Sequence, residues 1–447
     1  MSSHKILLWS ITVALGGFLF GFDTAVISGA EQAIQNVWNL DDFNHGLAIA
    51  IALYGTVIGA LFGGIPSDKL GRKRTLIWVA ALYLISALGS ALATDQYLFM
   101  FFRFIGGIGV GTSSVVAPMY ISEISPANKR GQLVALFQFN VVLGILIAYV
   151  SNYFLDGVSV NSWRWMLGVE AVPALFFLTM VIRVPRSPRW LIIKKHNEEE
   201  ARKVLEIIAP ESVDQAIMSI RQSAGSENAS GIRKAFDGQY NFQFMLVFLF
   251  AFFNQFSGIN AIIYYAPRIF NLTGASGSSA LLSTAGIGFM NLIFTLLGMY
   301  FIDRVGRKKL MYIGSFGLIV SLSLVAYSFY IEKFSLLPVY LFAYISFFAM
   351  SQGAVIWVFI SEIFPNDIRA VGQSFGSFIH WILAAIIANT FPYFVSVFEA
   401  SSIFLFFAFM MVLQLLYVWK MMPETKGRSL EEISAEFAEE NSTVKIT

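Results

Sequence analysis

Hydrophobic residues gather in about twelve long runs along the chain, separated by polar junctions. A helix needs about 20 apolar residues to cross the hydrocarbon core of a bilayer. Lipid offers backbone N–H and C=O groups no hydrogen-bond partner, so helices are expected rather than open sheets. The runs cover residues 6–30, 46–67, 75–93, 97–121, 132–155, 165–184, 242–271, 279–302, 310–331, 336–361, 371–396 and 401–422. The pattern predicts an all-α membrane protein with twelve transmembrane helices.

Composition narrows the class further. Hydrophobic residues make up 57% of the 447 residues and charged residues only 13%, which excludes a soluble globular protein. The net charge of +2 gives no reason to expect nucleic-acid binding, and the absence of cysteine excludes disulfides and thiolate metal sites. The acidic and histidine residues show no spacing typical of a nucleophile or a metal site, so we expect no enzyme, no cofactor and no metal.

Lysine and arginine are distributed unevenly between alternate junctions. One set of junctions carries Lys69, Arg72, Lys73, Arg74, Lys129, Arg130, Arg304, Arg307, Lys308, Lys309, Arg369, Lys426 and Arg428. The other set carries little beyond Arg164, Arg268 and Lys333. Positively charged loops stay in the cytoplasm, so we expect both termini there, in a multi-pass protein of the plasma membrane (the inner membrane in a bacterium).

One long polar stretch, residues 186–239, divides the chain into two parts. Its charges alternate with apolar residues at helical spacing, which predicts short amphipathic helices in the cytoplasm. We therefore expect a first six-helix bundle over residues 1–185, the helical linker, a second six-helix bundle over residues 240–422 and a polar cytoplasmic tail over residues 423–447. The last residues of the tail are expected to be disordered.

Three charged motifs occur twice, between 235 and 239 residues apart. They are DKLGRKR at Asp68 with DRVGRKK at Asp303, YISEISPANKRG around Glu123 with FISEIFPNDIRAVG around Glu362, and PRSPRWL at Pro185 with PETKGRS at Pro423. Repeats at nearly one offset indicate two copies of a six-helix unit. Two parallel halves with a ligand site between them near the membrane midplane are typical of a transporter.

Asp23 lies inside the first apolar run, where a carboxylate costs a few kcal/mol. It is therefore expected to face the protein interior or a water-filled cavity, and glycines at 16, 17, 21 and 29 leave room beside it. In the second half, Asn260 is its counterpart 237 residues later. Only the first half thus holds a titratable group at this position.

Arg103 is the expected partner of Asp23. At 1.5 Å per residue, Asp23 lies about 10 Å and Arg103 about 9 Å below the same outer surface. Each buried charge needs a partner, so the matching depths predict an ion pair. The pair could be a static link between two helices, or protonation of Asp23 could release Arg103 and favour a second conformation. We favour the second interpretation.

The repeated junction motifs place acids beside arginines at helix ends. The expected pairs are Asp68 with Arg72 and Lys73, Glu123 with Arg130, Asp303 with Arg307, and Glu362 with Arg369. Gly71 and Gly306 permit the tight turns. Topology signals alone would explain some of the basic residues but not the acids at fixed spacing, so a gate network that closes and parts in alternation is the preferred interpretation.

Taken together, these motifs resemble the sugar porter family of the major facilitator superfamily, and the bacterial xylose/proton symporter type in particular. The resemblance is carried by DKLGRK from Asp68, RFIGGIGVG from Arg103, PMYISEISPANKRG from Pro118, SPRWL from Ser187, QFSGINAIIYY from Gln255, DRVGRKK from Asp303, WVFISEIFP from Trp357 and PETKGRS from Pro423. It implies alternating access about a central hexose or pentose site, with proton coupling through Asp23 and Arg103.

The resemblance also implies a set of sugar ligands: Gln138, Gln255, Asn260, Asn291, Trp357 and Trp381, with Phe20 nearby. Amides can both donate to and accept from sugar hydroxyls, and indole rings pack on the C–H faces of sugars. The amides could instead bridge helices, and each tryptophan could be an interface anchor, although both tryptophans fall well inside their runs.

Several residues depart from the family pattern. Asn254 replaces a second glutamine of the sugar site, and His380 replaces a glutamine or asparagine. The His380 imidazole could bind a hydroxyl and add a pH dependence, or it could be a packing residue. Ala354 and Ile356 stand where the tenth helix usually has prolines, which argues against the usual break in that helix. Arg186 replaces a glutamate, which weakens one contact of the gate network.

The sequence therefore predicts a proton-coupled monosaccharide importer that functions as a monomer in the bilayer. A facilitator of the same fold, with a structural Asp23–Arg103 pair, is one alternative. A sugar sensor is another, but the chain ends about 25 residues after Pro423, with no long signalling extension.

Overall fold

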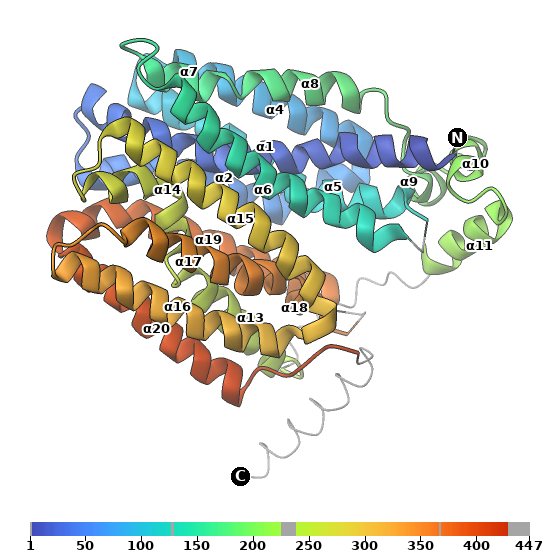
Figure 1. The fold of residues 1–447 in the computed structure, drawn as a ribbon. Helices are drawn as coiled ribbons and strands as arrows, with labels where there is room; N and C mark the ends of the chain where they lie inside the picture. Colours follow the sequence, from blue (N-terminus) through green and yellow to red (C-terminus); the bar gives the residue numbers. More distant parts are fainter. Residues whose placement is uncertain (1, 127–128, 225–237, 366–367, 428–447) are drawn as a thin grey trace. The chain divides into compact units, whose positions relative to one another are not determined.

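A computed structural model describes residues 2–126, 129–224, 238–365 and 368–427 (Figure 1). Twelve helices within these residues are long and apolar enough to cross a membrane, so the predicted number of spans is confirmed. The described part of the chain contains no strand. The predicted disorder at the end of the tail lies outside the described residues.

The helices fall into two compact units. The first unit contains α1 (Ser2–Val37), most of α2 (Asp42–Phe62), α3 (Gly64–Leu70), α4 (Arg72–Leu92), α5 (Gln96–Ile124), α6 (Arg130–Leu155), α7 (Ser162–Gly168), α8 (Ala171–Val181), α9 (Pro188–Ile193), α10 (Glu198–Ile208) and α11 (Val213–Ala224). The second contains α13 (Asn241–Gln255), α14 (Ile259–Asn271), α15 (Gly277–Val305), α16 (Arg307–Tyr330), α17 (Leu337–Phe348), the π-helical turn η2 (Ala349–Gly353), α18 (Ala354–Glu362), α19 (Arg369–Val397) and α20 (Ala400–Lys420). Residues 40–47, at the start of α2, cluster with the second unit.

Helices α1 and α6 approach each other closely enough for their backbones to touch. A Cβ added at Gly21 would collide with the Val141 carbonyl group, and one added at Gly144 would collide with the Phe18 carbonyl oxygen. Glycines on both helices therefore permit a packing distance that a larger side chain would prevent. The two helices form one rigid pair within the first unit.

The seventh membrane span is interrupted. Helix α13 ends at Gln255, and α14 begins at Ile259 after Gly258, whose φ of +84° favours glycine. The ring of Phe407 packs on Gly258 from α20. Interrupted helices at membrane depth are tolerated where protein or a water-filled cavity surrounds them, and Ser257 and Ile259 on either side of this break are buried.

The tenth span stays helical from Leu337 to Glu362 but contains a π-helical turn. The sequence offers no proline at Ala354 or Ile356, yet the five-residue π-helical turn η2 separates α17 from α18. The hydroxyl of Ser351 in this turn donates to the carbonyl of Phe347 on α17 at 2.6 Å. The helix is therefore widened here without a break, and such π-helical turns are frequent at functional sites.

The linker helices α9, α10 and α11 lie together near the start of α1 (Figure 1). They share an apolar core formed by Trp190, Leu191, Ile192, Ala201, Leu205 and Ile217. Their outer faces carry ion pairs such as Lys203 with Glu199 at 2.7 Å. These are the amphipathic helices that the charge pattern predicted for this stretch.

We predict that Gly258→Ala destabilises the protein more than Gly274→Ala. Both glycines have a φ near +80°, so alanine at either position costs about 1–3 kcal/mol of backbone strain. Only the Cβ at position 258 would also press on a ring, that of Phe407, whereas the space around Gly274 is open. Thermal unfolding of the two purified variants measures the difference, and equal midpoints would contradict the packing constraint.

Candidate functional site

Asp23 and Arg103 form an ion pair in the interior of the first unit. The Arg103 Nη1 donates to Asp23 Oδ1 at 2.5 Å, and Nη2 donates to the Asp23 backbone carbonyl at 3.2 Å. The two residues are only 2% and 1% exposed. Helices α1 and α5 supply them, as the depth comparison predicted. At such burial, removing one charge would leave the other uncompensated, which costs about 3–5 kcal/mol.

Glu170 lies beside this pair and was missed in the sequence analysis. It is 1% exposed, lies between α7 and α8, and is close enough to Asp23 and Arg103 to interact with them electrostatically. An acid inside the sixth apolar run was the signal that could have identified it, as with Asp23 in the first. Two carboxylates and one guanidinium carry a net charge of −1 when all are ionised, so one bound proton neutralises the cluster.

The cluster has unused hydrogen-bonding capacity. Among the described residues, Arg103 Nε and Glu170 Oε1 are buried without a hydrogen-bond partner. Ser86 and Gly106 lie next to Asp23 Oδ1, so small groups surround the carboxylate. A proton arriving at this cluster can therefore be accompanied by a rearrangement of donors.

Two further predicted residues of the first unit lie on the α1–α6 pair. Phe20 is half-buried on α1, one turn before Asp23, and Gln138 is half-buried on α6. The Phe137 backbone, next to Gln138, faces Gly17 of α1. Gln138 and Asp23 are thus carried by the same rigid pair of helices.

The amides of the second unit form a connected network at the break between α13 and α14. Asn260 Nδ2 donates to Gln255 Oε1 at 2.5 Å, and Gln255 Nε2 donates to Asn254 Oδ1 at 3.1 Å. Gln255 Nε2 also lies 3.1 Å from the nearer ring nitrogen of His380 on α19. The structure therefore brings together four of the predicted sugar-site residues.

Aromatic rings adjoin this network. The His380 ring lies 4.9 Å from the ring of Trp357 and 4.7 Å from that of Trp381, measured between centroids. Trp357 on α18 is 37% exposed, whereas Trp381 is buried. Asn291 on α15 is also buried, and it accepts a hydrogen bond from Thr295 at 3.4 Å. Apolar rings beside linked amides match the two kinds of surface that a sugar presents.

At helix ends of each unit, one arginine contacts two acidic side chains. In the first unit, Arg72 contacts Asp68 at 2.8 Å and Glu123 at 3.0 Å. In the second, Arg307 contacts Asp303 at 2.9 Å and Glu362 at 2.7 Å. We call these sets the first and the second arginine cluster. Each arginine also donates to a carbonyl five residues earlier, at Ser67 or Ile302, at 3.1 Å.

The expected partners of two acids were wrong. Among the described residues, Glu123 is bound by Arg72 and Glu362 by Arg307, in place of Arg130 and Arg369. Arg369 Nε instead donates to the Phe364 carbonyl at 3.4 Å. Proximity in sequence misled the prediction, because the neighbouring helix brings an arginine closer than the following turn does.

The second arginine cluster includes two residues that were not predicted. Glu424 accepts hydrogen bonds from the backbone amides of Arg307 and Lys308 at 3.0 and 3.1 Å, at the start of α16. The Thr425 hydroxyl donates to Glu362 at 2.7 Å. A carboxylate on the amides of a helix N-terminus is favourable, which explains the acid in the PETKGRS motif.

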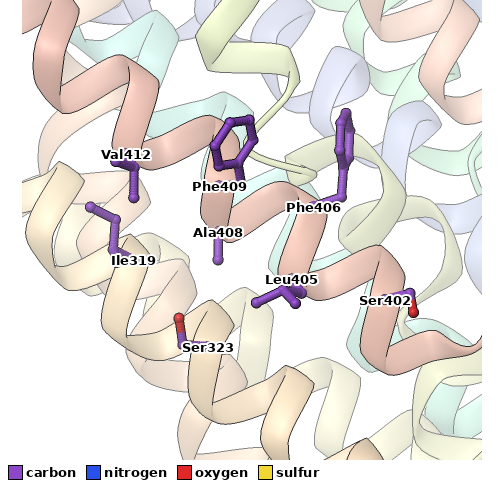
Figure 2. A pocket seen from close by; sticks show the side chains of 8 residues that line it. All are labelled: Ile319, Ser323, Ser402, Leu405, Phe406, Ala408, Phe409 and Val412. Atoms are coloured by element: carbon purple, nitrogen blue, oxygen red, sulfur yellow. The ribbon is translucent and has the colours of Figure 1, made fainter.

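A groove of about 600 Å³ lies away from all of these residues, between α16 and α20 (Figure 2). Its walls are Ile319, Ser323, Ser402, Leu405, Phe406, Ala408, Phe409 and Val412. Only two hydroxyls face it, and Leu405 and Phe409 are exposed on a membrane-spanning helix. Such a surface suits lipid and lacks the polar groups that a sugar requires.

Comparisons with known proteins agree with this architecture. Residues 9–437 match the family model described as sugar (and other) transporter. The D-xylose-proton symporter of Escherichia coli strain K12 is 35% identical, covering 100% of this chain and 98% of the relative. The arabinose-proton symporter of Bacillus subtilis strain 168 is 36% identical, covering 96% of this chain and 94% of the relative.

Solved structures give the same result. The xylose transporter from Escherichia coli, in a partially occluded inward-open conformation, superposes with a TM-score of 0.85 at 33% identity, covering 95% of this chain and 100% of that one. Family, relatives and fold are those of transporters and not of enzymes. The chain therefore belongs to the sugar porter family of the major facilitator superfamily.

Proposed function

We propose that this protein imports a monosaccharide together with a proton by alternating access. The single observation that carries the coupling is the buried Asp23–Arg103 pair with Glu170 beside it. An ionisable cluster inside a membrane protein marks a proton or substrate pathway by default. Relatives named as proton symporters of xylose and arabinose support the same function.

In this mechanism, Asp23 receives a proton from the outer side and its hold on Arg103 weakens. The sugar binds at the amide–aromatic network of the second unit, and Gln138 of the first unit is the further ligand that the likeness to sugar porters implies. The proton then leaves toward the cytoplasm with the sugar. A membrane potential contributes ~2.3 kcal/mol per elementary charge for each 100 mV, which drives accumulation.

The arginine clusters complete the cycle as a gate on the cytoplasmic face. Each cluster ties the start of one helix to the end of another, through Arg72 and Glu123 or through Arg307 and Glu362. Parting of these contacts in one state and reformation in the other gives two discrete arrangements of the helix ends. We call the Arg72–Glu123 contact of the first arginine cluster the first cytoplasmic latch, and the Arg307–Glu362 contact of the second arginine cluster the second cytoplasmic latch.

The sugar site of the second unit is supported by its chemistry. Gln255 and Asn260 present linked donors and acceptors beside Trp357 and His380. A neutral imidazole has one donor and one acceptor, so His380 can orient Gln255 and also reach a hydroxyl. We therefore assign His380 to the sugar site rather than to packing alone.

We predict that Asp23→Asn abolishes uphill uptake but retains sugar counterflow. Asparagine keeps the size and an acceptor for Arg103 but cannot exchange a proton. Proteoliposomes with an imposed pH gradient measure uptake, and preloaded vesicles measure counterflow. If the variant still accumulated sugar, proton coupling through Asp23 would be rejected. The Asp23–Arg103 pair would then be a static link between helices.

Asp41→Asn is the matched control. Asp41 lies outside the membrane spans, and hydrogen bonds from the Asn44 backbone amide and side chain hold the pKa of its carboxyl below the usual value. It therefore stays ionised at the pH values of the assay. Its replacement should leave both uptake and counterflow unchanged.

We predict that Gln255→Ala raises the sugar concentration for half-maximal counterflow by about tenfold or more, because losing buried hydrogen bonds costs about 1–3 kcal/mol. Gln243→Ala removes another buried amide, three turns earlier on α13, and serves as the control. The control should lower thermal stability without changing sugar affinity. Equal affinity losses in both variants would place the sugar elsewhere.

A further inference from the structure

The two arginine clusters depend on equivalent turns, at Gly71 and Gly306, but different groups cover these turns. Gly71 has a φ of +91° and Gly306 a φ of +99°, so both turns require glycine. Over Gly306 lies the Glu424 carboxylate, which accepts the amides of Arg307 and Lys308. Over Gly71 lies the indole ring of Trp190.

Trp190 contacts the turn by packing its ring on Gly71 and by a hydrogen bond. Its Nε1 donates to the Asp68 backbone carbonyl at 2.9 Å, and the side chain is 3% exposed. The Asp68 carboxylate in turn contacts Arg72 at 2.8 Å. The indole thus fixes the backbone of the residue that holds one side of the Arg72 guanidinium.

The residue that would correspond to Glu424 has a different partner in the first unit. Arg186 stands in that motif, and it contacts Glu200 of α10 at 3.4 Å. In the first unit, the turn is therefore supported from the linker helices, through Trp190 on α9, rather than by a carboxylate on the amides.

We propose that Trp190 is a positioning residue for the first cytoplasmic latch: it holds the Asp68–Gly71 turn so that Arg72 reaches Glu123. The linker helices α9, α10 and α11 act on the latch through this side chain. The inference rests on the cytoplasmic latches proposed above. It adds the residue that sets the geometry of the first latch and the element from which that residue comes.

The test uses a single cysteine, since the chain contains none. Ser125 ends α5 two residues after Glu123, is 4% exposed and donates to the Ile121 carbonyl. The accessibility of a cysteine at this position therefore reports how firmly the Arg72–Glu123 contact keeps the end of α5 in place. N-ethylmaleimide labelling of the purified full-length protein in detergent is timed in this background. Trp190→Phe keeps a ring on Gly71 but removes the N–H donor.

We expect Trp190→Phe to raise the labelling rate about two- to tenfold, the range for losing one hydrogen bond. Ile217→Ala, in the apolar core of the same linker helices, is the control. It should lower thermal stability and leave the labelling rate unchanged. Equal acceleration by both variants would mean that Trp190 acts only through the apolar core, and it would overturn the inference. So would a Trp190→Phe variant that is labelled at the same rate as the Ser125→Cys parent.

Glu123→Gln in the same background tests the latch itself. It removes the charge that Arg72 binds, so labelling should be faster than in the parent. Fast labelling of Glu123→Gln with parental labelling of Trp190→Phe would keep the latch and reject the positioning role. Parental labelling of Glu123→Gln would reject the latch, whatever the sugar assays show, because labelling needs no transport.

Discussion

The carboxylate of Asp23 and the guanidinium of Arg103 can lie in a hydrocarbon-embedded protein only because each neutralises the other. This requirement constrains the rest of the first unit. Helices α1 and α5 must approach at one depth, small residues must leave space around the carboxylate, and a second acid can join only if a proton is shared. Such a cluster is costly to keep inside a membrane protein, because each buried charge needs its partner.

The second unit solves a different problem, that of presenting polar groups to a ligand from within a membrane. Its seventh span breaks at Gly258, and its tenth span widens at a π-helical turn. Both features depart from strict i, i+4 geometry, next to amides in one case and one turn before Trp357 in the other. Polar side chains thereby concentrate where two half-helices meet.

Much of this arrangement could be predicted from the residues. The lengths of the apolar runs predicted the twelve spans. Equal depths below one membrane surface, estimated from the helical rise per residue, paired Asp23 with Arg103. Ion-pair partners that come from a neighbouring helix were harder to predict from the sequence. Arg72 reaches Glu123 and Arg307 reaches Glu362, contacts between residues more than 50 positions apart. The π-helical turn has no signal as clear as proline, so its presence could not be inferred from Ala354 and Ile356.

The glycine contact between α1 and α6 has a mechanical consequence. Touching backbones cannot slide without breaking dense van der Waals packing, so the two helices transmit displacement like a single lever. Helix α1 carries Asp23, the proposed proton site, and α6 carries Gln138, a proposed sugar ligand. In the proposed cycle, the close packing of the two helices would carry a displacement from one position to the other without a chain of side-chain relays.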